Sequence, residues 1–351
     1  MYGENEVERG KLKGYLLELV LMKLLKQNNY IPVNATREPK KCVRENKKGF
    51  VEFKGRGCWH QIDLPFDYNR KVPFIYPIRL LGEAKFHKKA IKKAYIREYI
   101  GVLKDIQENY VVASGSKVKN LVQRRLEVGT IFSASGFQKE AEKLAYAHGI
   151  KTISYKNNPL FGDICKLIDD LEENHLSVKS IQKGNWKSFR EHTINCLEES
   201  DTDIYEVNGE ETLFEGDYKA KLEQLCEKVN DIKTSFVATT ATGFMIHFLG
   251  EQEFPEELFR EGDIGHCRVY YNGDVARDKR SFWLVFSRDW DERKFYFSPP
   301  ESLDRAIVLG RQETLNEKEE IFRELNVSIK IDRFERNLRI MLEKDWFDGL
   351  R

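Results

Sequence analysis

The chain has 351 residues, of which 41% are hydrophobic, and this is enough for two ordinary globular domains rather than a disordered chain. Its six cysteines are scattered without a C-x-x-C pair, which argues against a structural zinc site and a disulfide framework and indicates a reducing cytoplasm. The acidic start, MYGENEVERG, and the charges inside GYLLELVLMKLLK argue against secretion and against a membrane-spanning helix.

Charge divides the chain into two unlike halves. Residues 1–160 carry 31 Lys+Arg against 16 Asp+Glu, a net charge of +15, whereas residues 161–351 carry 27 against 41, a net charge of −14. The opposite signs predict two domains, and we place the boundary near residue 175. Clustered Lys and Arg gain affinity by releasing counterions from phosphates, so the first domain is expected to bind a polyanion. A basic surface that is merely solvated is the alternative.

The first half alternates helices and strands. The apolar spacing in ERGKLKGYLLELVLMKLLKQNNY predicts a helix with one buried face. After it we expect strands at 49–57, 58–68 and 72–86, a helix at 88–110, a strand at 128–136, a helix at 137–149 and a strand at 150–155. Because strands joined through helices are usually parallel neighbours, this order predicts an α/β core, a mixed sheet flanked by helices.

The acidic half, residues 176–351, is expected to form an α+β domain of unknown role. A helix, DICKLIDDLEENH, precedes it, and a loop-like run covers residues 198–217. Strands are expected within 235–249, 267–278 and 282–299, and helices at NEKEEIFREL (316–325) and RFERNLRIMLEKDW (333–346). The aromatic side chains in this half form either a binding face or a hydrophobic sandwich: Trp283, Trp290, Phe295 and Tyr296.

One strand of the basic half carries an acid and a base on the same face. In the segment RLLGEAKFHKK, Glu83 and Lys85 are two residues apart and therefore project together. Asp63, in CWHQIDL, is on the preceding strand, and pairing of the two strands would bring it beside Glu83. Two adjacent carboxylates repel unless a cation lies between them, and Mg²⁺ favours such carboxylates together with phosphate oxygens. The backbone carbonyl of Ala84 would add a ligand. Lys85 would orient or help deprotonate the attacking water and would offset transition-state charge.

An E-x-K pattern alone is weak, since a chain with 33% charged residues should contain it roughly once or twice by chance. Glu52 and Lys54, in VEFKG, have the same spacing, but no aspartate precedes them to complete a metal site. Only Asp63 followed by Glu83 and Lys85 gives the full set.

The segments GYLLELVLMKLL, CWHQIDL, PIRLLGEAK and GTIFSASGFQKEAEKLAYAHGIKTISY together resemble the nuclease core of Mrr-like restriction endonucleases of the PD-(D/E)xK superfamily. The resemblance covers about residues 10–156. It implies a restriction-endonuclease-like fold over residues 1–175, an accessory acid on the first helix, and a catalytic set at Glu18, Asp63, Glu83 and Lys85. The proline that often precedes the aspartate is absent here.

The resemblance and the site together predict a Mg²⁺-dependent DNA endonuclease in restriction or anti-phage defence, with Mn²⁺ as a possible substitute ion. The chain is further expected to form a homo-oligomer or to bind a partner protein of a defence system. It is not expected to bind a membrane. DNA-backbone contacts are expected from the basic residues after the motif: Lys88, Lys89, Lys92, Lys93 and Arg97. His60 would touch metal or phosphate, or would simply pack beside Trp59. The alternatives are a repair, junction or RNA nuclease of the same fold, and an inactive nucleic-acid-binding module.

Overall fold

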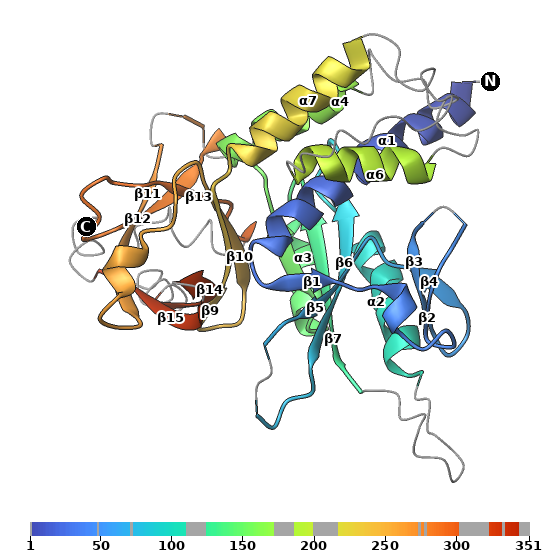
Figure 1. Cartoon of the computed structure of the whole chain (residues 1–351), viewed down its shortest axis with the longest axis horizontal. Coiled ribbons are helices and arrows are strands. Elements are labelled where there is room, and N and C mark those ends of the chain that lie inside the picture. Colours follow the sequence, from blue (N-terminus) through green and yellow to red (C-terminus); the bar gives the residue numbers. More distant parts are fainter. Residues whose placement is uncertain are drawn as a thin grey trace.

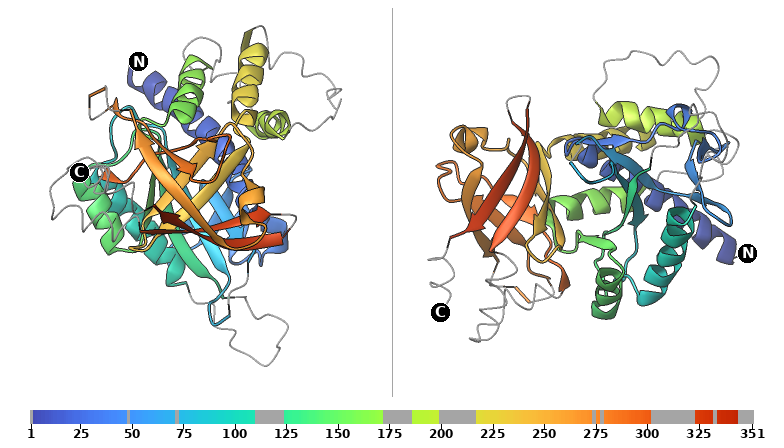
Figure 2. Two further views of the ribbon diagram at one scale, coloured as in Figure 1. Left: turned by 90° about the vertical axis from the view of Figure 1, so that its left-hand side faces the viewer. Right: turned by 90° about the horizontal axis from the view of Figure 1, so that it is seen from below.

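The computed structural model of the chain describes residues 2–47, 49–70, 73–109, 124–171, 186–198, 217–272, 275–276, 279–301, 323–331 and 334–343. In this part of the chain a five-stranded sheet flanked by helices lies beside a closed seven-stranded barrel (Figures 1 and 2). A small three-stranded sheet packs at the edge of the helical layer. None of the described helices is both long enough and apolar enough to cross a bilayer.

The five-stranded sheet has the order β1-β5-β6-β7-β8. Its members β1, β5 and β6 pair antiparallel, whereas β6, β7 and β8 are parallel neighbours joined through helices. The elements are α1 (Tyr2–Lys26), β1 (Tyr30–Pro32), β5 (Leu64–Tyr68), β6 (Ile78–Lys85), α2 (Lys93–Gln107), β7 (Leu126–Ser133), α3 (Lys139–Ala147), β8 (Lys151–Ser154) and α4 (Pro159–Asp170). The predicted mixed sheet flanked by helices is therefore confirmed.

The strands expected at 49–57, 58–68 and 72–86 differ in the structure, because part of this region forms a second, small sheet. The segment expected as one strand at 58–68 is two strands, and Asp63 lies at the break between them. The small sheet has the order β2-β3-β4, with all pairs antiparallel. Its elements, with the preceding 3-10 helix, are η1 (Ala35–Arg37), β2 (Val43–Glu45), β3 (Val51–Lys54) and β4 (Trp59–Gln61).

Alternation along β6 directs its side chains into two cores. Leu80 and Ala84 face the cluster built around α1 and α4, whereas Leu81 faces the cluster that contains α2, α3 and the small sheet. The first cluster also includes residues of α6 (Trp186–Leu197) and α7 (Asp217–Asn230). This core therefore includes residues on both sides of position 175, and the domain boundary expected there stays a prediction.

The barrel has the strand order β10-β13-β12-β11-β15-β14-β9 and an interior rich in phenylalanine. Its elements are β9 (Thr234–Thr240), β10 (Met245–Gly250), η5 (Glu256–Phe259), β11 (Ile264–Tyr271), β12 (Phe282–Phe286), β13 (Phe295–Phe297), β14 (Glu324–Ile331) and β15 (Phe334–Leu342). The described residues of the acidic half thus comprise the helices α6 (Trp186–Leu197) and α7 (Asp217–Asn230) followed by this barrel, so helices and strands both occur as expected but lie in separate parts of the half.

The helix expected at 333–346 is wrong, because its first nine positions after Arg333 form β15. Leu338 and Ile340 point into the barrel, and Asn337 and Arg339 point to solvent. This alternation of period two fits a strand, and the pairing with β14 and β11 satisfies its backbone. Most of the other expected helix, at 316–325, lies outside the described residues, and its last two positions begin β14.

A buried polar network joins the barrel to the α/β core. His247 of β10 lies between Tyr155 Oη, 2.7 Å from its Nδ1, and Ser235 Oγ, 2.7 Å from its Nε2. Asn28, just after α1, donates to Ser235 Oγ at 3.0 Å and accepts from the backbone N–H of Val237 at 2.8 Å. Burial lowers the pKa of His247 to about 3, so the ring is neutral and serves these hydrogen bonds.

Candidate active site

Pairing of β5 with β6 brings the predicted acids together. Leu64 is the register partner of Gly82, so Asp63 lies next to Glu83 across the two strands. The backbone N–H of Ala84 donates to Asp63 Oδ2 at 3.1 Å, which fixes the carboxylate at this position. Glu83 also forms an ion pair with Lys85 on the same face of β6. The structure thus assembles the predicted acid, acid and lysine, while Ala84 turns its side chain into the core.

Close approach of the two strands depends on glycine at position 82. A Cβ atom there would lie 2.7 Å from Leu64 Cβ and 3.0 Å from Leu64 O, both closer than van der Waals contact allows. Leu64 is itself fully buried and cannot move aside freely. Gly82 therefore allows β5 and β6 to approach closely at the pair Leu64–Gly82, which is next to Asp63 on one side and Glu83 on the other.

The carboxylates of Asp63, Glu83 and Glu18 repel one another in a poorly solvated place. Burial, followed by the charge of Glu83, raises the pKa of Asp63 to about 7. Glu18 comes from α1, which packs against β5 and β6, and its pKa is raised well above the usual range by burial and then by Asp63 and Glu83. These three residues, called the acid cluster below, come from α1, from β6 and from the turn just before β5. A divalent cation would relieve the repulsion between them.

Lys85 remains charged in this setting. Burial lowers the pKa of Lys85, but the charge and hydrogen bond of Glu83, together with the charges of Asp63 and Glu98, outweigh burial, so the net pKa is raised. A lysine held as an ammonium is suited to orienting a water molecule and to facing developing negative charge. It is poorly suited to removing a proton as a general base.

Arg190 is a cation of the site that the sequence analysis did not identify. It lies on α6, donates to the carbonyl of Gly49 at 2.7 Å, and its charge opposes the rise in the pKa of Glu18. It acts in the same way on Tyr15, the neighbour of Glu18 on α1. No motif marks Arg190, since it is far from the first-half segments in sequence and reaches them only through the packing of α6 on α1.

The second E-x-K pattern has a structural explanation. Glu52 accepts a hydrogen bond from Arg44 Nε at 2.7 Å across the β2–β3 pair. Lys54 lies over the ring of Trp59, 5.8 Å from its centre. These contacts stay within the small sheet, and Lys54 therefore serves as a matched control for Lys85.

The expected DNA-contact residues form an exposed basic surface where the chain leaves β6 and enters α2. All five side chains are exposed: Lys88, Lys89, Lys92, Lys93 and Arg97. The surface begins three residues after Lys85, so cations and acids lie at the same end of the strand. Solvation alone would also expose these residues, so their role in DNA contact stays a prediction.

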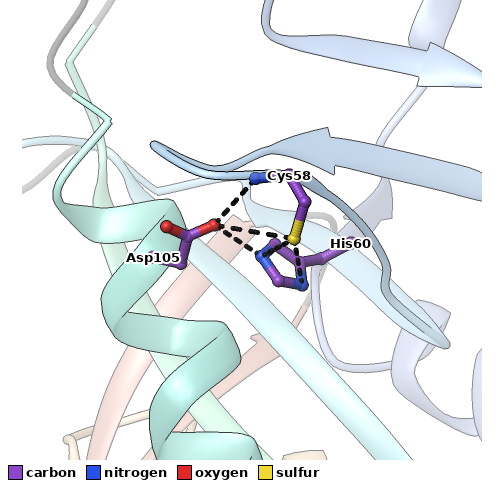
Figure 3. A group of neighbouring side chains, drawn as sticks. All are labelled: Cys58, His60 and Asp105. Carbon is purple, nitrogen blue, oxygen red and sulfur yellow. Dashed lines mark hydrogen bonds and ion pairs between the residues drawn. The ribbon is translucent and has the colours of Figure 1, made fainter.

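His60 does not join the acids of β5 and β6. Its Nε2 lies 2.7 Å from Asp105 Oδ2 and 3.4 Å from Cys58 Sγ, in a separate cluster between the small sheet and α2 (Figure 3). Asp105 was not singled out from the sequence because it is 45 residues away on a helix. The only signal was the Cys-x-His spacing.

The four aromatic residues of the acidic half do not act together. Phe295 is fully buried in the barrel core, and Trp290 is almost fully exposed. Trp283 and Tyr296 lie side by side on the outer face of the barrel with ring centres 6.1 Å apart, and Tyr270 stacks on Trp283. Of the four residues, Phe295 thus belongs to the barrel core and the other three lie on the surface.

Comparisons with known proteins give no family for this chain. No family model matches it, and no curated protein matches it. A solved structure titled "Crystal Structure of Protein of Unknown Function AF1548" is similar over 62% of this chain and 96% of that chain, with 14% sequence identity and a TM-score of 0.34. A TM-score of this size does not establish a shared fold.

Proposed function

We propose that the chain is a Mg²⁺-dependent endonuclease that hydrolyses phosphodiester bonds in DNA. The observation that carries the proposal is that Asp63, just before β5, lies beside Glu83 of the paired strand β6, with Lys85 next to it. Glu18 is close enough that, after burial, the charges of Asp63 and Glu83 raise its pKa. Such crowded acids favour a divalent cation, and carboxylates with a nearby lysine suit phosphoryl chemistry. A setting in restriction or anti-phage defence follows only from the resemblance to Mrr-like restriction endonucleases.

Each residue has a role in this proposal. Asp63, Glu83 and the carbonyl of Ala84 would hold the ion, which would polarise the scissile phosphate and lower the pKa of a bound water molecule. Glu18 would add negative charge from the side of α1. Lys85 would orient the attacking water and stabilise the negative charge that grows on the phosphate oxygens.

The basic surface would hold the substrate backbone. Its five cations are exposed and begin three residues after Lys85, so a DNA strand bound by them would pass the acid cluster. Binding of this kind is non-specific and depends steeply on salt. Sequence recognition would need further contacts.

The test uses the full-length chain with Mg²⁺ against methylated plasmid, unmethylated plasmid, single-stranded DNA and RNA. We expect plasmid cleavage that is abolished by EDTA. Lys85→Ala should cleave slower by about two orders of magnitude while still binding DNA, as expected for the loss of one preorganised electrostatic group. Lys54→Ala, the same change on a strand of the small sheet, should cleave like the parent.

Several results would overturn this proposal. Full cleavage in excess EDTA would exclude the metal, and equal activity of both lysine variants would exclude the assigned site. Cleavage of RNA alone would change the substrate class. If no nucleic acid is cut but DNA is bound, the chain is a binding module.

A further inference from the structure

Cys58, His60 and Asp105 bring three different ligand types to one point outside the acid cluster. Cys58 lies just before β4, His60 lies within it, and Asp105 lies near the end of α2 (Figure 3). Their ligand atoms all lie within 4.8 Å of one another. Asp105 is twelve residues, about 18 Å along the helix, from the N-terminus of α2. The Cys58–His60–Asp105 cluster is therefore distinct from the acid cluster that contains Glu83 of β6.

The contacts of the imidazole favour a metal centre over a nucleophilic triad. In a triad the acid and the nucleophile bind opposite ring nitrogens. Here Asp105 Oδ2 and Cys58 Sγ both approach Nε2 of His60, at 2.7 Å and 3.4 Å, whereas Nδ1 is 4.0 Å from the sulfur. Three ligand atoms that converge in this way surround a common point, as ligands of one ion do.

The distances suit a tetrahedral ion of the zinc class. Zn²⁺ binds S, N and O atoms at about 2.0–2.3 Å, so its ligands are about 3.3–3.7 Å apart. The S–N, S–O and N–O separations here are 3.4, 4.0 and 2.7 Å. Each is within about 1 Å of the tetrahedral value. Cys58 is exposed, which leaves the fourth position open to water.

The surrounding backbone holds the acid in place. Gly57 N–H donates to Asp105 Oδ1 at 2.9 Å, and Cys58 N–H donates to Oδ2 at 3.3 Å. A Cβ atom on Gly55 would lie 2.0 Å from Asp105 Oδ2 and 3.0 Å from His60 Nε2, so only glycine leaves room for these two side chains to meet. Outer contacts that orient a ligand in this way are typical of metal sites.

We propose that Cys58, His60 and Asp105 bind one Zn²⁺-class ion, which fastens the β3–β4 turn to α2. On binding, the thiol of Cys58 loses its proton to solvent, and the proton on His60 Nε2 moves to Nδ1 so that Nε2 can ligate. The ion would stiffen β4, whose last residue, Gln61, hydrogen-bonds Asp63. The site does not depend on the proposed nuclease activity.

The test adds Co²⁺ to the metal-free full-length chain and records the near-ultraviolet thiolate-to-cobalt absorption, to which the acid cluster cannot contribute because it has no thiol. We expect the band in the parent protein and its loss in Cys58→Ser, an exposed position where serine should not disturb folding. Cys42→Ser should keep the band. Cys196→Ser should keep it too, although it removes another thiol near an imidazole, 3.7 Å from His192 Nε2.

Zinc stoichiometry by mass spectrometry gives a second measurement. One Zn²⁺ per chain should be retained in the presence of excess Mg²⁺ by the parent and by Asp63→Asn, and lost by Cys58→Ser. Zn²⁺ should also raise the Tm of the parent more than that of Cys58→Ser. Absence of the cobalt band in the parent, or its survival in Cys58→Ser, would show that the cluster only pins the turn by hydrogen bonds and would overturn the proposal.

Discussion

Replacing Asp63 with asparagine should stabilise the metal-free protein at pH 8. The folded-state pKa of Asp63 is about 7, whereas an unfolded aspartate titrates near 3.9, so the folded state binds more protons between these values. Stability is therefore lost as pH rises from about 4 to about 7, and the full penalty is present above that range. Asparagine removes the charge and keeps an oxygen that can accept from Ala84 N–H.

The size of the effect follows from the same shift. About three pKa units correspond to ~4 kcal/mol, which is an upper bound because Glu18 and Glu83 share the repulsion. We expect a gain of roughly 1–4 kcal/mol at pH 8, or a Tm higher by several degrees, and a much smaller gain near pH 4. Thermal unfolding of both proteins in EDTA, across this pH range, measures it.

Mg²⁺ should reverse the order of stability. An ion present at 1,000 times its Kd stabilises the parent by about 4.1 kcal/mol, which exceeds the largest gain expected for the variant, and the variant should gain far less from the ion. Asp67→Asn, on the strand that follows Asp63, is the control. Asp67 pairs with Arg79 and Arg125 at 2.7 and 2.8 Å, so its loss should destabilise the protein at any Mg²⁺ concentration. Lower stability of Asp63→Asn at pH 8, or an equal Mg²⁺ response of parent and variant, would refute the assigned acid cluster.

Three further outcomes are expected. Mn²⁺ should replace Mg²⁺ in cleavage, whereas Ca²⁺, larger and looser in coordination, should support DNA binding with little turnover; equal turnover with Ca²⁺ would contradict the site. Gly82→Ala should push β5 from β6 and lower cleavage at least about tenfold, whereas Gly101→Ala on α2, where a Cβ meets nothing within 4 Å, should raise Tm slightly and leave cleavage unchanged. Lys93→Glu should weaken DNA binding and reduce the slope of log K against log salt by about 1 or more, and Lys166→Glu on α4 should change neither; equal losses in a filter-binding assay would argue against a local DNA surface.

Local pattern was enough to predict the strand that carries Glu83 and Lys85. The apolar run before it, the helix after it and the parallel order of the next two strands all appear in the structure. Asp63 was also expected beside Glu83, because two consecutive strands of this length pair most simply with each other. These features follow from the spacing of apolar and polar residues within each segment and from the order of the segments along the chain.

Features that depend on distant packing were missed. Arg190 comes near Glu18 only because α6 packs on α1. Asp105 reaches His60 only because α2 shares a hydrophobic core with the small sheet. The absence of a C-x-x-C pair argued against zinc, but a site built from a helix and a turn needs no such pair. The segment at 333–346 failed for a related reason, since pairing with two barrel strands outweighed its helical spacing.

Asn28, Tyr155 and His247 fasten the barrel to the ends of α1 and β8 through buried hydrogen bonds, so the barrel has a fixed place relative to Asp63. If the proposed endonuclease also bound a DNA feature through its barrel, that feature would lie a constant number of base pairs from the acid cluster. Cleavage of an end-labelled duplex would then give one product of defined length rather than a ladder, because the protein itself would fix the distance between the bound feature and the cut.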